Sequence, residues 1–282
     1  MPLTSTRELL AATTAGPSAV AAFNVITLEY AEAILAGAER AGRPVILQLS
    51  ENAVKFHGGN PRPLTRALAV LAEASSVPVS LHLDHVEDES LLYASADAGF
   101  SSVMFDAGRL AYADNVAATV RAVEWAHGRG LTVEAELGYV GGKDTQVSSA
   151  HATGVRTDPA QAAEFVAATG VDALAVAVGS SHAMRSRDAQ LDHELIDQLR
   201  AAVPVPLVLH GSSGVADDDL RAAIAAGMRK INIGTILSVA FTSGVRAALT
   251  ADPELTDPRA YLRAGRDNLA DQVHALLGVV SP

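Results

Sequence analysis

Eight short runs of apolar and β-branched residues recur along the chain, and segments with helical spacing separate them. The runs cover residues 19–25, 44–50, 78–85, 101–106, 131–137, 171–179, 205–211 and 229–235. Short apolar strands that alternate with helices are typical of a parallel sheet. Eight such units in 282 residues predict a closed (β/α)8 barrel, the TIM barrel of the α/β class, as a single domain over residues 1–282. An open, doubly wound sheet is the alternative.

The segments between the runs carry signals for where helices start and stop. Asp158 is placed to cap a helix whose first residue is Pro159, and Gly170 stands just past the end of that helix. In "DDDLRAAIAAG" three aspartates fill the first turn, which suits the helix dipole, and Gly227 marks the stop. No linker or low-complexity segment interrupts the pattern, which favours one domain.

The composition excludes several classes of function. The formal net charge is −11 and the pI is about 5.2, which argues against nucleic acid or an anionic membrane as a partner. The chain has no cysteine, so it has neither a thiolate nucleophile nor a Cys-ligated zinc site. Arg7 and Glu8 stand where a signal peptide needs its apolar core, and no apolar run approaches about 18 residues. We therefore expect a soluble, cytoplasmic protein.

Polar residues gather where the predicted strands end. All strands of a parallel barrel end at one rim, and this rim holds the active sites of such barrels. The residues are Asn24, Ser50, Asp84, His85, Asp106, Glu134, Glu136, Gly179, His182, His210, Gly211, Ser212, Ser213, Asn232, Gly234 and Thr235. Because barrel interiors are usually filled by Val, Ile and Leu, this alignment of polar ends predicts a functional site.

Three histidines stand at or just past the ends of the third, sixth and seventh runs. They are His85, His182 and His210. Three neutral imidazoles with an open fourth position form a usual catalytic zinc environment. A single histidine at such a place more often caps or packs a loop, but three on one rim favour a metal site. His82 shares a strand face with Asp84 through the period of two, which predicts a supporting hydrogen-bond partner.

Three loop stretches suggest how a substrate is held. "HGSSGV" and "NIGT" end the seventh and eighth runs, and their small residues leave backbone N–H groups free to surround an anion such as phosphate. An ordinary turn is the alternative reading of each. The long, glycine-containing connection after residue 137 suggests a mobile lid over the substrate, with a merely disordered loop as the alternative.

Seven stretches, in order, are together similar to one family. They are "AFNV", "LHLDH", "VEAELGYVGG", "AVAVGSSH", "LVLHGSSGV", "KINIGT" and "YLRAG". This set resembles the class II, zinc-dependent ketose-bisphosphate aldolases, which include the fructose-1,6-bisphosphate and tagatose-1,6-bisphosphate aldolases. The similarity runs from about residue 7 to residue 275. Each motif alone is weak, whereas the ordered set is highly specific.

The resemblance implies a function and its partners. The family reversibly cleaves a phosphorylated ketose into dihydroxyacetone phosphate and an aldehyde such as glyceraldehyde 3-phosphate, and fructose 1,6-bisphosphate is the leading substrate. Zinc is the implied cofactor, with a monovalent cation, Na⁺ or K⁺, beside it. Members form homo-oligomers, commonly dimers or tetramers, so we expect a homo-oligomer here.

The resemblance also assigns roles to residues near the reacting atoms. His85, His182 and His210 match the zinc ligands, because zinc polarises the ketone during cleavage. Asp84 matches the acid/base at the C4 hydroxyl. Asp106 and Glu136 match positions used near the metal, as ligands or as partners that fix the imidazole tautomers.

The remaining matches concern the two ends of the substrate. The binding segments for the dihydroxyacetone phosphate half and the monovalent cation comprise Gly179, Gly211, Ser212, Ser213, Asn232, Gly234 and Thr235. Positions linked to the far half are matched by Asn24, Ser50 and Arg263. A guanidinium such as that of Arg263 suits a distal phosphate because it binds phosphate in a bidentate way.

Two positions depart from the family pattern. Members usually have glycine after the strand-six histidine, where this chain has Ala183. The lid usually carries a glutamate that moves the C3 proton of dihydroxyacetone phosphate, and here "GGKDTQ" offers Asp144, which is one methylene shorter. These departures leave the sugar open between fructose 1,6-bisphosphate, tagatose 1,6-bisphosphate and another ketose 1-phosphate, including a sulfonated one.

Other classes of function remain as alternatives. A Schiff-base aldolase needs a lysine inside the barrel, and none of Lys55, Lys143 and Lys230 lies in the sixth run. A metal-dependent hydrolase or isomerase on the same barrel is an enzymatic rival, because the fold alone does not fix the chemistry. A non-catalytic sugar-phosphate-binding barrel is the alternative outside the enzymes.

Overall fold

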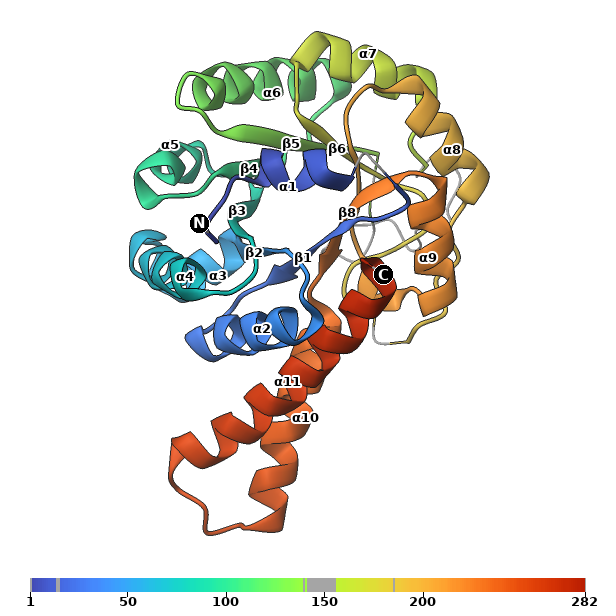
Figure 1. Cartoon of the computed structure of the whole chain (residues 1–282). Helices are drawn as coiled ribbons and strands as arrows, with labels where there is room; N and C mark the ends of the chain where they lie inside the picture. Colours follow the sequence, from blue (N-terminus) through green and yellow to red (C-terminus); the bar gives the residue numbers. More distant parts are fainter. Residues whose placement is uncertain (1, 14–15, 139, 141–155, 185, 282) are drawn as a thin grey trace.

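Eight parallel strands close into a barrel (Figure 1). The computed structural model describes residues 2–13, 16–138, 140, 156–184 and 186–281. The strands are β1 (Val20–Asn24), β2 (Val45–Ser50), β3 (Val79–Val86), β4 (Ser102–Phe105), β5 (Thr132–Leu137), β6 (Ala173–Val176), β7 (Leu207–Leu209) and β8 (Met228–Ile233). Each strand pairs with the next, and β8 also pairs with β1. The closed ladder confirms the (β/α)8 prediction and contradicts the open sheet, whose first and last strands would not pair.

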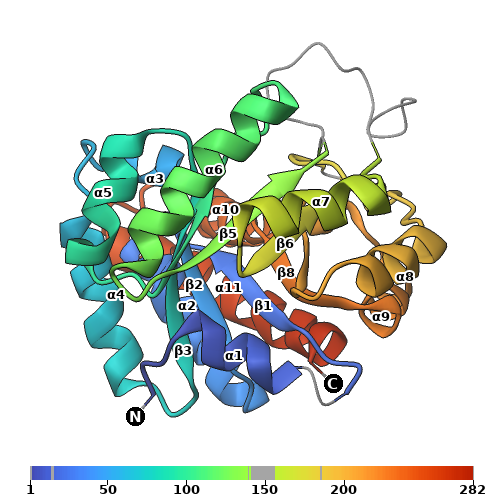
Figure 2. The same ribbon diagram turned by 90° about the horizontal axis from the view of Figure 1, so that it is seen from above.

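Helices surround the strands (Figure 2). They are α1 (Thr6–Ala12), α2 (Leu28–Ala41), α3 (Glu51–Phe56), α4 (Arg62–Ala74), α5 (Glu89–Ala98), α6 (Tyr112–His127), α7 (Pro159–Thr169), α8 (His193–Ala202), α9 (Asp217–Ala226), α10 (Thr235–Ala251), α11 (Pro258–Val280) and the 3₁₀ turn η2 (Ser212–Gly214). The predicted cap of α7 is confirmed, since the Asp158 side chain accepts a hydrogen bond from Gln161 N and Gly170 is left-handed. Gly227 is likewise the C-cap of α9.

Helix α1 closes the N-terminal end of the barrel. Its Leu9 and Leu10 pack against small and branched side chains of the strands. Leu9 joins Val20, Ala22 and Ile46, and Leu10 joins Ala173, Ala175 and Val208. The Thr6 hydroxyl hydrogen-bonds the hydroxyls of Ser80 and Ser102. Because this end is plugged, the C-terminal end of the barrel is left to form a binding site.

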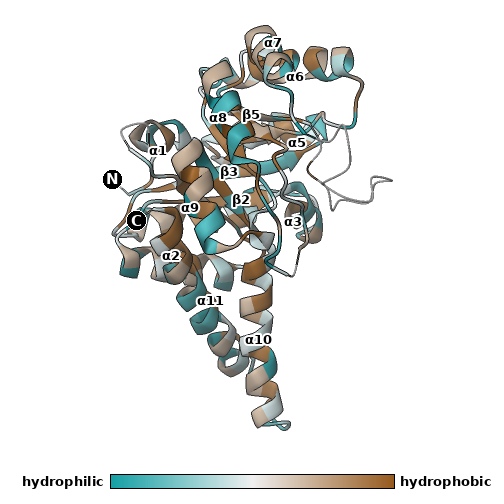
Figure 3. Ribbon diagram, turned by 90° about the vertical axis from the view of Figure 1, so that its right-hand side faces the viewer, coloured by the Kyte–Doolittle hydropathy of each residue, from teal (hydrophilic) through white to brown (hydrophobic). Residues whose placement is uncertain are grey.

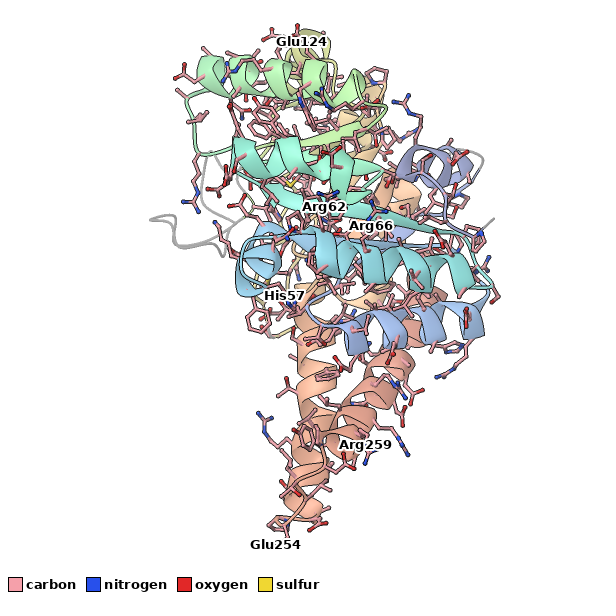
Figure 4. The ribbon with its side chains drawn as sticks, turned by 90° about the vertical axis from the view of Figure 1, so that its left-hand side faces the viewer. His57, Arg62, Arg66, Glu124, Glu254 and Arg259 are labelled. Atoms are coloured by element: carbon pink, nitrogen blue, oxygen red, sulfur yellow. The ribbon has the colours of Figure 1, made fainter. Side chains whose placement is uncertain are left out.

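Helices α10 and α11 project from the barrel as an arm (Figure 1). Glu254 and Arg259 lie toward its far end (Figure 4). The sequence of α10, "TILSVAFTSGVRAALTA", is largely apolar (Figure 3), yet Val239 and Leu249 are 51% and 40% exposed. An apolar helix with so little cover marks the arm as a surface suited to contact with another protein. Within the described residues, no helix is both long and apolar enough to cross a membrane.

The contact between α2 and α11 requires a glycine. A Cβ built on Gly37 of α2 would lie 2.7 Å from the carbonyl oxygen of Ala270 and 2.8 Å from the Val273 side chain. These distances are too short for real contacts, and the nearest atom belongs to backbone. The base of the arm is therefore held to the barrel layer by a close helix–helix approach.

Gly37→Ala is expected to lower the free energy of unfolding by about 1–3 kcal/mol, because the two helices must move apart. Gly278→Ala in α11 is the matched control, since a Cβ there meets nothing within 4 Å. The control should be neutral or stabilise by about 0.5 kcal/mol through its better helix propensity. Denaturant unfolding of both variants measures the difference. Equal effects at the two positions would contradict the close packing.

Candidate active site

A pocket of about 200 Å³ lies at the C-terminal ends of the strands. Its lining includes residues at or just past the ends of β1, β2, β3, β6, β7 and β8, as the rim prediction requires. The predicted residues that line it are Asn24, Ser50, Asp84, His85, His182, Gly211, Ser212, Ser213, Asn232, Gly234 and Thr235. Gln48, Asn52, Ser181 and Ala183 complete the lining. Gln48 and Asn52 were not among the predicted residues, although Gln48 lies on the same strand face as Ser50 through the period of two.

The three predicted histidines come together at this pocket, which His85 and His182 line and beside which His210 lies buried. One ligand atom from each of His85, His182 and His210 lies within 4.8 Å of the other two. The ring centroids are 4.8 Å apart for His85 and His210, 5.2 Å for His85 and His182, and 5.7 Å for His182 and His210. Convergent imidazoles at this spacing suit a single divalent metal ion.

A local break in β3 lets two consecutive residues face the pocket. Successive side chains of a regular strand point to opposite faces, yet both Asp84 and His85 line the pocket. The pairing of β3 with β4 shifts register between Leu83 and Val86, and His85 has the left-handed φ of 51°. A non-glycine residue rarely adopts this conformation, which costs roughly 1–2 kcal/mol. The strained turn therefore places the carboxylate beside the imidazole.

Carboxylates hold two of the three imidazoles. Asp106 Oδ2 lies 2.9 Å from His85 Nδ1, and Glu136 Oε2 lies 2.8 Å from His210 Nδ1. Such contacts fix the ring orientation and the tautomer of a metal-ligating histidine. Within the described residues the cluster suited to a metal ion consists of the three histidines, and a role of Asp106 and Glu136 as ligands or as orienting partners stays a prediction.

His210 is held from both sides. Its Nε2 lies 2.9 Å from Glu134 Oε1, in addition to the Glu136 contact at Nδ1. Burial by itself lowers the pKa of His210, but the hydrogen bonds with Glu134 and Glu136 outweigh it and raise the pKa to about 9. A metal bound to His210 would have to replace one of these two contacts.

The donor set fits zinc. Zinc binds histidine nitrogen, three histidines are a common catalytic set, and carboxylate-held imidazoles are the usual surroundings. His85 and His182 are partly exposed at the pocket while His210 is buried, so the pocket side remains open for a substrate. These features match a catalytic zinc site, in which one coordination position of the metal stays open for water or substrate.

Asp84 lies beside the histidines and is only 2% exposed. Asn24 Nδ2 donates to its Oδ2 at 3.5 Å, and Asn232 Nδ2 donates to its Oδ1 at 3.4 Å. Burial alone would raise the pKa of Asp84, but the fields of His85 and Lys230 lower it below its ordinary value. The carboxylate is therefore ionised near neutral pH and able to accept a proton.

His82 lies close to Asp84 on the same face of β3. Its Nε2 lies 4.0 Å from Asp84 Oδ1, which is longer than a hydrogen bond, so the predicted partnership is a close contact only. His82 Nδ1 lies 2.7 Å from Ser102 Oγ, which in turn hydrogen-bonds Thr6 Oγ1 of α1. Burial is the main cause that lowers the pKa of His82 to about 3, so its ring is neutral.

Lys230 on β8 lies inside the barrel and is fully buried. Lys230 was set aside as a Schiff-base lysine because it is not in the sixth strand, and its place inside the barrel was not predicted. Its Nζ donates to Glu134 Oε2 at 2.7 Å and to Asn232 Oδ1 at 2.8 Å. Lys230 does not line the pocket, so its amine is committed to these partners and is not presented to a substrate.

The loops after β6 and β7 approach each other closely. Gly211 has a φ of 68°, and a Cβ there would lie 2.6 Å from the backbone of Ser181. Ala183 also has a positive φ, of 60°, which explains why glycine suits that position better. Ala183 also lines the pocket, next to His182 in the sequence.

Two further predicted residues within the described part of the chain do not line this pocket. Gly179 lies near the carbonyl oxygen of Gln190. Arg263 lies on α11 and lines an outer groove with Glu32 and Arg266, so its contact with the far half of the substrate stays a prediction. Asp144 lies outside the described residues.

Comparisons with known proteins agree with this geometry. The family model "Fructose-bisphosphate aldolase class-II" matches residues 4–281. The fructose-bisphosphate aldolase of Geobacillus stearothermophilus is 40% identical over 268 residues, which cover 95% of this chain and 93% of that protein. The probable fructose-bisphosphate aldolase of Bacillus subtilis (strain 168) is 37% identical over 97% of this chain and 95% of its own length.

Solved structures give the same result. The crystal structure of the YdjI aldolase from Escherichia coli K12 has a TM-score of 0.85 at 32% identity and covers 99% of this chain and 97% of its own. A putative fructose-1,6-bisphosphate aldolase from Coccidioides immitis has a TM-score of 0.86 at 29% identity, with coverage of 98% and 95%.

Asp106→Ala is expected to weaken zinc binding by roughly 10–100-fold, because His85 loses the carboxylate that orients its ring. Competition with a chromogenic chelator measures the affinity. Asp114→Ala, at an exposed aspartate in the first turn of α6, is the matched control and should leave the affinity unchanged. An Asp106→Ala protein that is folded and binds zinc as tightly as the wild type would rule out the orienting role.

Proposed function

Since the chain belongs to the class II fructose-bisphosphate aldolase family, we propose that it reversibly cleaves a phosphorylated ketose, with fructose 1,6-bisphosphate as the leading substrate. The products are dihydroxyacetone phosphate and an aldehyde, glyceraldehyde 3-phosphate for this sugar. The observation that carries the proposal is the cluster of His85, His182 and His210 next to the buried carboxylate of Asp84.

His85, His182 and His210 would hold the zinc ion, and Asp106 would keep the His85 ring in position. The ion would take the place of Glu136 at Nδ1 of His210, and Glu134 would hold that ring through Nε2. When bound, zinc supplies a Lewis acid that polarises the substrate ketone and stabilises the negative charge developing as the C3–C4 bond breaks. The chain's contribution is to hold the imidazoles at one side of the pocket and the substrate at the other.

Asp84 moves a proton in this scheme. In cleavage its carboxylate accepts the proton of the C4 hydroxyl, the C4–O bond becomes the aldehyde carbonyl, and the electron pair of C3–C4 goes to the dihydroxyacetone phosphate half. In condensation the protonated Asp84 returns the proton. The amide groups of Asn24 and Asn232 hold the two carboxylate oxygens. Asp144 is the proposed group that exchanges the C3 proton.

The substrate ends are assigned to different loops. The N-terminus of α10, which begins at Thr235, and the turn at Ser212 and Ser213 present backbone N–H groups and hydroxyls suited to a phosphate. We place the phosphate of the dihydroxyacetone phosphate half there, together with a monovalent cation. Asn24 and Ser50, which also line the pocket, would contact the far half.

Two alternative functions can be distinguished from this one by experiment. A tagatose 1,6-bisphosphate aldolase, or one for another ketose 1-phosphate, would use the same residues and differ in the C4 configuration or the distal group. A non-catalytic binding barrel would bind sugar phosphates without turnover, and the Ala183 methyl group in the pocket is the described feature that favours it. A cytoplasmic location stays a prediction.

The test is bound-metal content measured beside cleavage of fructose 1,6-bisphosphate and tagatose 1,6-bisphosphate. We expect about one zinc per chain and turnover that a chelator abolishes and added zinc restores. Asp84→Asn should retain zinc, because Asp84 is no ligand, and should lose at least about 10²-fold in kcat through the missing proton acceptor. A zinc-loaded protein that cleaves neither sugar would favour the rivals, and near-normal turnover by Asp84→Asn would contradict its role.

We also propose that the protein works as a homo-oligomer, a dimer or tetramer. The support is the exposed apolar surface of α10 on the arm, since such surfaces mark protein contacts and most oligomers are assembled from identical chains.

Val239→Asp should shift the protein to monomers in analytical ultracentrifugation, because it places a charge on the exposed face of α10. Val70→Asp is the matched control, since Val70 is also a helical valine, 65% exposed, but lies on α4. Assembly that survives Val239→Asp would place the contact on another surface.

A further inference from the structure

The polar side chains inside the barrel form one connected network, and Lys230 is at its centre. Lys230 is 0% exposed, as is His210, and Glu134 is 3% exposed. Lys230 Nζ contacts Glu134 Oε2 and Asn232 Oδ1. Glu134 reaches His210 through its other oxygen, and Asn232 reaches Asp84 through its amide nitrogen. One ammonium group is thus two contacts away from both a proposed metal ligand and the proposed acid/base.

Lys230 determines which way the Asn232 amide faces. An ammonium group has donors and no acceptor, so only the amide oxygen of Asn232 can face it. The amide nitrogen must then point away, toward Asp84 Oδ1 at 3.4 Å. An uncharged side chain at position 230 would allow the amide to turn over and present its oxygen to the Asp84 carboxylate, where the two acceptors repel.

A second amide on the opposite side of Asp84 shows the same arrangement with a neutral donor. Gln48 Nε2 donates to Asn24 Oδ1 at 2.8 Å, and Asn24 Nδ2 points at Asp84 Oδ2. Each oxygen of Asp84 therefore faces an amide nitrogen whose own oxygen is held by a buried donor. The repetition on two different strands indicates that the orientation of both amides matters at this site.

Lys230, which holds the Asn232 amide, is charged, whereas Gln48, which holds the Asn24 amide, is neutral. Glu134 is a carboxylate that is only 3% exposed, and its Oε2 lies 2.7 Å from the Lys230 ammonium. A buried charge without a partner is strongly destabilising. Lys230 supplies the compensating charge and leaves Glu134 Oε1 directed at His210.

We propose that Lys230 is a positioning residue of the active site, which fixes the Asn232 amide toward Asp84 and holds Glu134 against His210. The inference rests on the proposed aldolase function, because it assigns Asp84 and His210 their roles. Lys230 acts through these neighbours and forms no bond with the substrate. The Lys230 ammonium thereby orients groups at both the proposed metal ligand His210 and the proposed acid/base Asp84.

Lys230→Met tests the proposal, since methionine has a similar length and offers no donor. We expect kcat for fructose 1,6-bisphosphate cleavage to fall by roughly 10²-fold, as for other small displacements of catalytic groups, with a smaller change in KM. Zinc affinity, measured separately by chelator competition, should fall by roughly tenfold as Glu134 loses its anchor. Lys55→Met is the matched control at a lysine side chain that is 64% exposed, and both quantities should stay unchanged.

A double variant separates positioning from charge balance. Lys230→Met leaves Glu134 unpaired and can impair folding, whereas Lys230→Met with Glu134→Gln removes both charges. We expect the double variant to fold, as judged by circular dichroism, and to keep the low kcat, because nothing holds the Asn232 amide. Recovery of wild-type kcat in the double variant would show that Lys230 only neutralises Glu134 and would overturn the proposal.

Rescue by a lysine analogue completes the test. Because the chain has no cysteine, unfolded Lys230→Cys can be alkylated with 2-bromoethylamine at that position alone and then refolded. The product carries an ammonium at nearly the length of lysine, so kcat and zinc affinity should both recover. A refolded, aminoethylated protein that stays as impaired as Lys230→Met, beside wild type that survives the same treatment, would contradict the proposal.

Failure of this inference can be told apart from failure of the proposed function. If the wild type cleaves no ketose phosphate, the function fails, and the zinc affinities together with crystal structures of the variants still test Lys230. A turned Asn232 amide and weaker zinc binding in Lys230→Met would then support the positioning role. An unchanged amide and unchanged zinc affinity would overturn it.

Discussion

Glu134 is a carboxylate in the middle of the barrel that contacts an ammonium and an imidazole at once. Barrel interiors are normally filled by branched apolar side chains in layers. In this barrel the apolar layer lies at the N-terminal end, around Leu9 and Leu10 of α1. The layers toward the C-terminal end consist of polar and charged side chains. Such a core is stable only when each buried charge has a partner. The network of Lys230, Glu134 and His210 meets that requirement, and His210 at its end lies with the other two histidines.

The pocket depends equally on a departure from regular strand geometry. A strand presents alternate residues to the interior, so Asp84 and His85 would be separated by an intact β3. The register shift and the left-handed backbone at His85 remove that separation. Energy stored in local backbone strain at functional positions is compensated by the surrounding fold. In this protein Asp106 provides part of that compensation through its contact with the His85 ring.

The sequence predicts the barrel and most of the pocket, because both follow from periodicity and from where polar residues stop each apolar run. His85, His182 and His210 are examples, since each follows a strand and parallel strands share a rim. Lys230 and Gln48 were missed because their roles depend on neighbours across the barrel, such as Glu134, which no local pattern links to β8. Arg263 was assigned to the pocket through a motif alone, whereas the arm carries it to an outer groove of the same chain. The bulge at His85 has no signal in the pattern of apolar residues.

The plug formed by α1 has a consequence for how the chain folds. Helix α1 precedes all eight strands in the sequence, yet Leu10 finds its partners only in Ala173, Ala175 and Val208, which belong to the second half of the chain. During synthesis Leu9 can contact its partners on β1 and β2 early, whereas Leu10 stays without cover until β6 and β7 have emerged. Contacts between residues so distant in sequence slow folding because the intervening chain must be ordered first. The complete docking of the N-terminal helix is therefore a late event that reports completion of the barrel.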